Sequence, residues 1–264
     1  MIWAILIGYG ALFTLMTIVW FVAMRKSNAA VVDVAWGAGL LLFALVTASL
    51  GGAPTLRTWI LAGMIAIWSG RLSLHLLRDR VLSGHGEDAR YAEIRTRWAS
   101  SLPLKFFLFF QLQAFMIAVL SLPFAVTMTN AEPSLTPLEW AGIALWAVAV
   151  AGESLADAQL ARFKSLPFSR GQVCRDGLWR YSRHPNYFFE WCIWIALFVY
   201  CLPSPYGYTA IAGVAVMYVV LTRMTGIALT EEHALRSRGD AYRTYQRTTS
   251  AFVPWFPKPQ EGAR

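Results

Sequence analysis

The sequence predicts an all-α, polytopic integral membrane protein with about seven transmembrane helices. Of its 264 residues, 57% are hydrophobic and only 14% are charged, whereas a soluble domain carries about a quarter charged residues. Apolar runs that approach the roughly 20 residues needed to cross a hydrocarbon core recur along the whole chain. The net charge of +8 is gathered in alternate loops between these runs.

Seven apolar runs are expected to span the membrane as helices. The first lacks a basic leading region and a small-residue cleavage site, and Arg25 and Lys26 follow it, so we expect a retained helix and not a cleaved signal peptide. The sixth is short and rich in aromatic residues. The predicted spans cover residues 1–24, 31–50, 59–77, 106–128, 138–160, 187–202 and 208–229.

The loop charges predict the orientation of these spans. With the N-terminus outside, the inside loops receive nearly all lysines and arginines, and the outside loops hold one basic residue, Arg57. This topology accounts for the basic balance without a nucleic acid partner. The polar clusters lie at the inside ends of the spans, so a site for a large charged ligand would open to the inside.

Cysteine and histidine spacing predicts no metal site. Cys174, Cys192 and Cys201 form no CxxC pair, and the four histidines form no HExxH motif. No Walker A sequence and no complete GxGxxG sequence is present either.

Two polar features stand out in the first half of the chain. Asp33 lies early in the second span, where a carboxylate is costly, and it is either an acid facing a cavity or an interfacial partner of Arg25 or Lys26. Arg71, His75 and Arg78 fall at i, i+4 and i+7 of the third span and so share a helical face. Snorkelling explains Arg78 but not Arg71, so we expect this stripe to face a ligand.

Two further clusters lie in the second half. Glu153 and Asp157 share a face at the end of the fifth span, with Arg162 following. They either pair helices or accept hydrogen bonds from ribose hydroxyls or a carboxamide. In RYSRHPNYFFEW, residues 180–191, Pro185 can begin a helix whose N-terminus, with Arg183 and His184 at the cap, suits a phosphate.

The C-terminal region continues this polar pattern. Glu231 and Glu232 stand at the inside end of the last span, and an amphipathic stretch with Tyr242, Tyr245 and Arg247 follows. This stretch either contributes to a site or lies on the lipid headgroups.

The stretch GLWRYSRHPNYFFEW, followed later by EEH and YRTYQRTTSAFVPWFP, resembles the C-terminal half of the steroid 5-alpha-reductase family, and more closely its bacterial branch. VVDVAWG and GRLSLHLLRDR also look like that branch. The RHPNY core is shared with sterol reductases and with isoprenylcysteine and phospholipid methyltransferases. The resemblance therefore implies a nucleotide-cofactor site more firmly than it implies which cofactor.

Carried over to this chain, the resemblance implies NADPH in an inside-facing cavity formed by residues 138–257, with residues 1–130 on the lipid-substrate side of a single transmembrane domain. Residues 258–264 are expected to form a short disordered tail. The implied location is a bacterial inner membrane, with the cofactor on the cytoplasmic side. The predicted cofactor-binding residues are Arg90, Asp157, Arg162, Tyr181, Arg183, His184, Asn186, Glu190, Tyr242, Tyr245 and Arg247.

The substrate side departs from the family pattern. Steroid reductases use a Gln-Glu pair on the second helix and a tyrosine on the third, and neither occurs here. We therefore predict Asp33 as the catalytic acid, with His75 or Arg71 as its partner.

The expected function is the NADPH-dependent reduction of an activated C=C bond in a lipid or steroid that enters from the bilayer. The alternative is an S-adenosylmethionine-dependent methyltransferase of the isoprenylcysteine or phospholipid type, and a third possibility is a non-enzymatic membrane protein, such as a lipid binder or a transporter subunit. The sequence indicates neither the lipid nor the oligomeric state.

Overall fold

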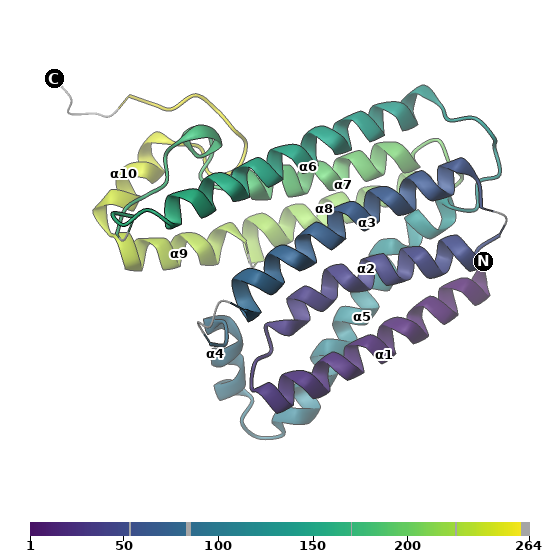
Figure 1. Cartoon of the computed structure of the whole chain (residues 1–264), viewed down its shortest axis with the longest axis horizontal. Helices are drawn as coiled ribbons and strands as arrows, with labels where there is room; N and C mark the ends of the chain where they lie inside the picture. The colour runs from purple at the N-terminus through teal and green to yellow at the C-terminus, as the bar shows by residue number, and fades with distance from the viewer. Residues whose placement is uncertain (53, 83–85, 170, 225, 260–264) are drawn as a thin grey trace. The chain divides into compact units, whose positions relative to one another are not determined.

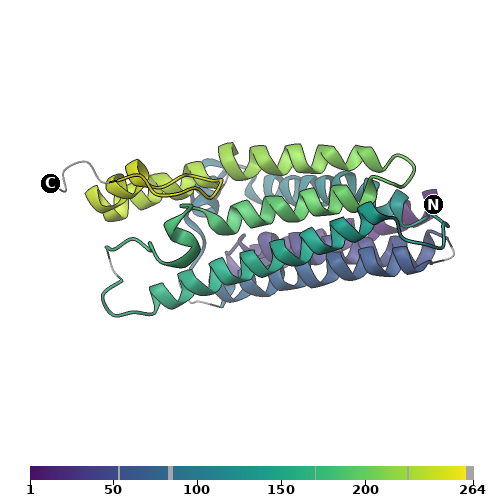
Figure 2. The same cartoon turned by 90° about the horizontal axis from the view of Figure 1, so that it is seen from above.

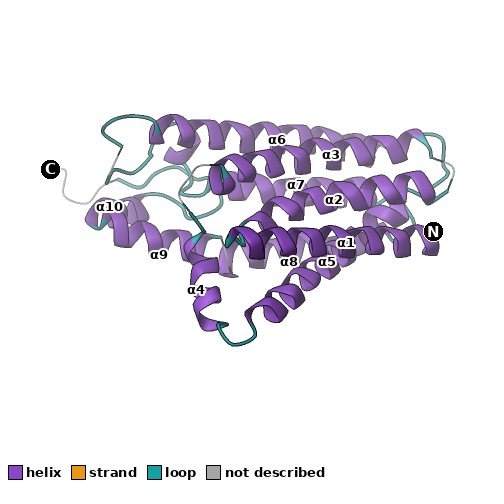
Figure 3. Cartoon of the chain, turned by 60° about the horizontal axis from the view of Figure 1, so that its bottom comes forward, coloured by secondary structure: helices purple, strands orange, loops and turns teal. Residues whose placement is uncertain are grey.

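The structure, a computed structural model, describes residues 1–52, 54–82, 86–169, 171–224 and 226–259. It is 77% helical, and the described part contains no strand (Figure 3). Six helical segments in that part are long and apolar enough to cross a membrane: Ile2–Lys26, Val31–Leu50, Leu56–Val81, Leu102–Thr127, Pro137–Lys164 and Gly207–Arg238. The predicted fold class is confirmed.

The remaining predicted span, residues 187–202, corresponds to helix α7, Pro185–Cys201 (Figure 1). It contains 17 residues and therefore extends about 26 Å at 1.5 Å per residue. This length is at the lower end of what crosses a hydrocarbon core.

The chain divides into two compact units. Unit 1 comprises Met1–Thr136 and Cys201–Ala210, and unit 2 comprises Pro137–Tyr200 and Ile211–Arg264.

Unit 1 is a bundle of membrane helices with α2 at its centre. Helix α2, Val31–Leu50, packs against α1, Ile2–Lys26, against α3, Leu56–Leu76, and against α5, Leu102–Thr127. Glycine allows close approach of the helices: a Cβ atom on Gly8 of α1 would lie 2.9 Å from the Phe43 ring of α2.

The two ends of unit 1 are closed by polar contacts and short elements. At one end, the buried Arg57 donates hydrogen bonds to the carbonyl oxygens of Glu132 and Ser134, at 2.6 and 2.8 Å. At the other end, α3 continues as a π-helical turn, η1, Leu77–Val81, and a short helix, α4, Ala89–Arg97, follows. The 3₁₀ turn η3, Gly207–Ala210, also belongs to this unit.

Unit 2 is built on three long elements that run side by side (Figures 1 and 2). Helix α6, Pro137–Lys164, meets α7 so closely that a Cβ atom on Gly142 would lie 2.8 Å from the Tyr200 backbone nitrogen. Helix α8, Ile211–Val219, meets α7 where the Trp191 indole donates to the Val214 carbonyl at 3.1 Å. A second π-helical turn, η4, Val220–Met224, extends α8.

The polar end of unit 2 consists of short elements packed on one another. Helices α9, Ile227–Arg238, and α10, Asp240–Thr248, follow η4, and the 3₁₀ turn η2, Gly177–Arg180, precedes α7. The segment after α10 then runs beside the segment before α7: Ser182 and Ser250 form a parallel bridge, and the Trp255 amide donates to the Tyr181 carbonyl at 2.9 Å.

Candidate functional site

The RHPNY stretch, residues 183–187, leads into α7. Its first residue, Arg183, contacts both α9 and the segment after α10. The Arg183 Nε donates to the Glu231 carboxylate of α9 at 2.6 Å. Its Nη1 donates to the carbonyl oxygens of Gln246 and Thr249, at 3.0 and 2.5 Å, and its amide donates to the Ser250 carbonyl. The Arg183 side chain is only 10% exposed. Its hydrogen bonds connect the start of α7 to α9 and to the segment after α10.

Glu231 lies at the centre of this cluster. Besides Arg183, its carboxylate contacts the His184 Nε2 at 3.3 Å and accepts a hydrogen bond from the Gln246 amide at 2.8 Å. We call Arg183, His184, Glu231 and Gln246 the Glu231 network. A buried carboxylate is tolerated when cations and donors compensate its charge, and three groups do so here.

His184 is buried and stacks on the Tyr187 ring, with the ring centroids 5.4 Å apart. Burial lowers the pKa of His184 below its usual value, and this effect outweighs the nearby Glu231 carboxylate, which raises it. The neutral imidazole is therefore the favoured form. The Tyr187 hydroxyl lies 3.3 Å from the Thr230 hydroxyl and adds a second contact between α7 and α9.

Two predicted cofactor-binding residues, Asn186 of α7 and Asp157 of α6, are in contact. The Asn186 amide donates to the Asp157 carboxylate of α6 at 3.1 Å, so residues 29 positions apart lie side by side. Glu190, one turn further along the same face, is buried and accepts a hydrogen bond from the Trp194 indole at 3.2 Å. The structure therefore brings Asp157, Asn186 and Glu190 to one end of unit 2.

Tyr242 and Tyr245 face the protein interior. The Tyr245 hydroxyl donates to the carbonyl oxygens of Trp179 and Ser182 and so holds the segment that precedes α7. Tyr242 packs edge-to-face against Tyr245, with the ring centroids 5.9 Å apart. Burial raises the pKa of both phenols well above the usual value, so both stay protonated and act as packing groups of the site's wall.

The other predicted residues of unit 2 lie on its surface. Arg162, at the end of α6, and Arg247, near the end of α10, are exposed. Tyr181 is 37% exposed, and its ring contacts Phe256 edge-to-face at 6.1 Å. These side chains are free to reach a ligand at the polar end of the unit.

Arg90 belongs to unit 1, where it contacts Asp33. The Asp33 carboxylate accepts hydrogen bonds from Arg80 of η1, from Arg90 at 3.3 Å and from the Tyr91 hydroxyl at 2.6 Å. We call these four residues the Asp33 network. The pairing with Arg25 or Lys26 that sequence proximity suggested is replaced by pairing with Arg80 and Arg90.

Two neighbouring carboxylates complete this end of unit 1. Asp88 caps α4 and binds the Arg90 Nε at 2.9 Å. Glu87 accepts two hydrogen bonds from Arg95, at 2.9 and 2.8 Å, and a third from the Ala29 amide at 2.7 Å. Although burial raises the pKa of Glu87, these hydrogen bonds outweigh it and hold the pKa below its usual value. The result is a set of ion pairs that fastens α4 to the start of α2.

This geometry bears on the predicted role of Asp33. Two guanidinium groups and a phenol all donate to its carboxylate, so both of its oxygens already accept hydrogen bonds from the protein. His75 is exposed, and across the described residues no hydrogen bond or ion pair joins it to Asp33. Arg71, one turn before His75, is half-buried.

Sequence reasoning missed several residues that organise the two networks. From the sequence, Glu231 is one of two acids at the inside end of the last span, Arg80 is explained by snorkelling, and Gln246 and Tyr91 carry no signal. A buried arginine and histidine need a carboxylate partner, and this requirement was the available signal for Glu231.

Comparisons with known proteins agree with the resemblance at a coarse level. The model of the family described as "Protein of unknown function (DUF1295)" matches residues 19–249 of this chain. Uncharacterized protein C594.04c of Schizosaccharomyces pombe is 25% identical over 272 residues, which cover 92% of this chain and 77% of that protein. No solved structure matches the chain. The family match includes both the Asp33 network and the Glu231 network.

Proposed function

Because this chain belongs to the family described as "Protein of unknown function (DUF1295)", a family within the steroid 5-alpha-reductase-like superfamily, we propose that it is a membrane reductase. Its reaction would be the NADPH-dependent reduction of an activated C=C bond in a membrane-soluble lipid. The observation that carries the proposal is the contact between Asp157 and Asn186 at the start of α7.

The chemistry of the donors at this end of unit 2 fits a phosphorylated dinucleotide. The Asn186 amide and the Asp157 carboxylate suit a carboxamide or ribose hydroxyls, which need both donors and acceptors. The exposed guanidinium groups of Arg162 and Arg247 suit phosphate groups. NADPH, when bound, would supply the hydride.

Arg183 has a different part in this proposal from the one the sequence suggested. Its Nε and Nη1 atoms are already bonded to Glu231, Gln246 and Thr249. We therefore assign Arg183 to holding the start of α7 in place, so that Asn186 and Glu190 keep a fixed orientation. In this proposal the exposed Arg162 and Arg247, and not Arg183, contact the phosphate groups.

Reduction of a conjugated C=C bond also needs a group that stabilises the negative charge developing on the substrate. Asp33 is a poor candidate, because its carboxylate is an acceptor for three donors. His75 is exposed on α3, and within the described part its side chain forms no hydrogen bond. We therefore propose His75 as the proton donor or polarising group.

The methyltransferase alternative keeps one specific supporting observation. Glu231 belongs to a Glu-Glu pair, and it contacts the arginine and the histidine of RHPNY. A joint between these two motifs is also what a methyltransferase of the same superfamily would need. The two functions require different cofactors, so a measurement of NADPH and S-adenosylmethionine binding distinguishes them.

The test measures the thermal unfolding of the detergent-purified protein with each cofactor. NADPH at about 100 times its dissociation constant should stabilise the protein by roughly 2.7 kcal/mol, and S-adenosylmethionine should have no effect. Stabilisation by S-adenosylmethionine alone would overturn the reductase proposal.

A matched pair of variants localises the cofactor. Asn186→Ala should weaken NADPH binding about tenfold, or about 1.4 kcal/mol. Asn130→Ala removes an asparagine that bonds Ser204 in unit 1 at 3.0 Å and should leave NADPH affinity unchanged. Equal effects of both variants would show that Asn186 only supports the fold.

The proposed role of His75 is tested by single-turnover oxidation of NADPH with a long-chain enone as substrate. His75→Ala should slow the hydride transfer about a hundredfold while leaving NADPH affinity intact. His233→Ala, which changes an exposed histidine of α9, is the control.

A further inference from the structure

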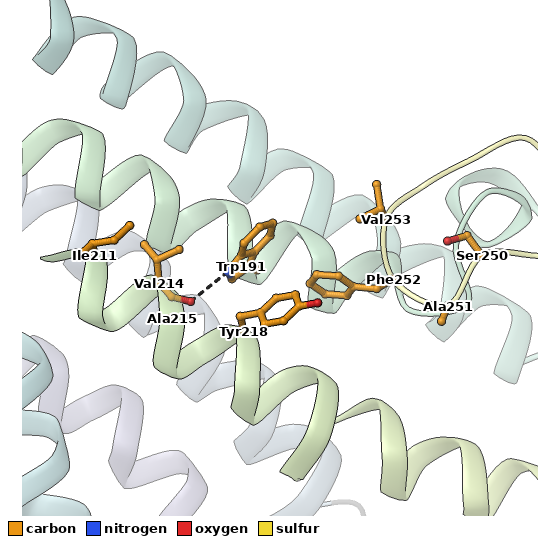
Figure 4. A pocket seen from close by; sticks show the side chains of 9 residues that line it. All are labelled: Trp191, Ile211, Val214, Ala215, Tyr218, Ser250, Ala251, Phe252 and Val253. Atoms are coloured by element: carbon orange, nitrogen blue, oxygen red, sulfur yellow. Dashed lines mark hydrogen bonds between the residues drawn. The ribbon is translucent and has the colours of Figure 1, made fainter.

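Unit 2 carries an open cavity of about 680 Å³ that is separate from the Asp157–Asn186 contact. It lies between α7, α8 and the segment that follows α10 (Figure 4). Its walls are mostly apolar. They are formed by Trp191 of α7, by Ile211, Val214, Ala215 and Tyr218 of α8, and by residues 250–253.

Three aromatic rings form the floor of this groove. Trp191, Tyr218 and Phe252 contact one another pairwise, with ring centroids 5.5 to 5.9 Å apart. The Trp191 indole N–H is bonded to the Val214 carbonyl, so the ring offers an apolar surface. Because these contacts fix all three rings, the groove is a preformed feature of the unit.

The groove begins at the polar end of unit 2 and runs toward the middle of its helices. Ser250 is level with the start of α7, since its carbonyl accepts the Arg183 amide at 2.8 Å. Trp191 follows Pro185 by six residues, or about 9 Å along α7. Ile211, the first residue of α8, lies about 10 Å further along α8 than Tyr218.

The rim of the groove is exposed and apolar. Ile211 and Val253 are 50% and 52% exposed. A surface of this kind on a membrane helix faces hydrocarbon, and a groove of this length accepts an alkyl chain lying along the helices.

Exposed basic and aromatic side chains lie on the segments that follow the groove-lining residues of α8 and the groove-lining residues 250–253. Arg223 of η4 follows Tyr218 by five residues and is exposed. Lys258 is exposed, and its amide donates to the Thr248 carbonyl at 2.8 Å, which places it beside the segment 249–253. Trp255 and Phe256 are 70% and 76% exposed, as aromatic residues at a membrane–water interface are.

We propose that this groove binds one acyl chain of an anionic phospholipid, whose headgroup lies against Arg223 and Lys258. The apolar walls match the chain, and the two basic residues match the phosphate at the level where a headgroup lies. This lipid is a bound component of unit 2 and is distinct from the proposed substrate.

The test is native mass spectrometry of the detergent-purified protein after titration with phosphatidylglycerol or phosphatidylcholine. The wild-type protein should retain one phosphatidylglycerol in preference to phosphatidylcholine. Ala215→Trp fills the groove and should reduce the retained lipid about tenfold. Ala212→Trp makes the same change at an exposed position of α8 outside the groove and should retain the lipid.

Further variants separate the chain site from the headgroup site. Arg223→Gln combined with Lys258→Gln should abolish the preference for phosphatidylglycerol and keep residual binding of both lipids. Val253→Asp, at a rim position that is 52% exposed, should weaken phosphatidylglycerol binding even if Ala215→Trp fails to fold. Equal lipid retention by Ala215→Trp, Val253→Asp and Ala212→Trp would overturn the proposal. Displacement of the lipid by one equivalent of a long-chain enone would also overturn it and make the groove a substrate site.

Discussion

Asp33 in unit 1 and Glu231 in unit 2 are both carboxylates on membrane helices that gather cations from distant segments, yet their surroundings differ. The Asp33 side chain is 21% exposed, and its partners Arg80 and Arg90 are 28% and 30% exposed. The Glu231 side chain is 15% exposed, with Arg183 at 10% and His184 at 4%. Solvent can therefore replace part of the Asp33 network but little of the Glu231 network.

The two networks therefore have different structural roles. The Asp33 network attaches one short helix, α4, to the start of α2. The Glu231 network joins α7, α9, α10 and the segment after α10, and the Asp157–Asn186 contact depends on the position of α7. A charge buried with its partners is costly to leave unpaired, so the two networks should respond differently to the loss of their central carboxylate.

The largest effect is expected for Glu231→Ala. It leaves Arg183 as an uncompensated buried charge and should lower the free energy of unfolding by about 3–5 kcal/mol, measured by denaturant titration in detergent. Glu232→Ala is the matched control, because Glu232 is 55% exposed and, among the described residues, forms an ion pair only with Arg236 four residues on. It should cost less than about 0.5 kcal/mol. Equal losses for the two variants would contradict the contrast drawn here.

Asp33→Asn should have an intermediate effect. It weakens three hydrogen bonds that are partly open to solvent and should cost about 1–3 kcal/mol, with faster hydrogen exchange of the α4 amides. Asp79→Asn, at an exposed aspartate of η1, should change neither. If Asp33→Asn slowed NADPH oxidation while α4 stayed protected, Asp33 would be a catalytic acid after all.

Two tyrosines refine the comparison at the level of single hydroxyl groups. Tyr245→Phe leaves the Trp179 and Ser182 carbonyl oxygens without their donor and should cost about 1–2 kcal/mol. Tyr91→Phe removes one donor from a carboxylate that keeps two cations, so it should cost about 1 kcal/mol or less. Tyr208→Phe, at a position that is 61% exposed, provides the reference, and a reversed order would refute the ranking.

The smallest effect is a pH dependence confined to the Glu231 network. Because burial lowers the pKa of His184 from its usual 6.5, the unfolded chain binds more protons than the folded one just below that pH. Stability should therefore fall by about 1 kcal/mol or less as the pH drops below about 6.5. His184→Gln should remove this dependence and His233→Gln should not. A pH profile that is the same in wild type and His184→Gln would contradict the assignment.

The membrane fold was predictable because apolar runs report burial in lipid directly. Helix ends were predicted less well, since an apolar run stops at the first charges while the helix continues into water. The run at residues 59–77 thus became Leu56–Val81, and the run at 138–160 became Pro137–Lys164. Helix α4, which is short and polar, gives no such signal.

The proximity of candidate site residues was predictable only where a motif existed. The resemblance singled out Asp157 and Asn186 from opposite sides of a long loop, and they are in contact. The partners of Asp33 were not predictable, because proximity in sequence favoured Arg25 and Lys26. Glu87 instead accepts a hydrogen bond from the Ala29 amide in the turn after α1. Helix α4 places Arg90 beside Asp33.

The pairing of Arg183 with the segment after α10 also constrains when its contacts can form during synthesis of the chain. The Thr249 carbonyl that accepts the Arg183 guanidinium lies 66 residues downstream, beyond every helix of unit 2. At about 5–20 residues per second, the ribosome takes roughly 3–13 seconds to supply it. While α7 and α8 are being synthesised, Arg183 still lacks the acceptors of its side chain, Glu231, Gln246 and Thr249. The contacts that close the polar end of unit 2 can therefore form only after this last segment has been synthesised.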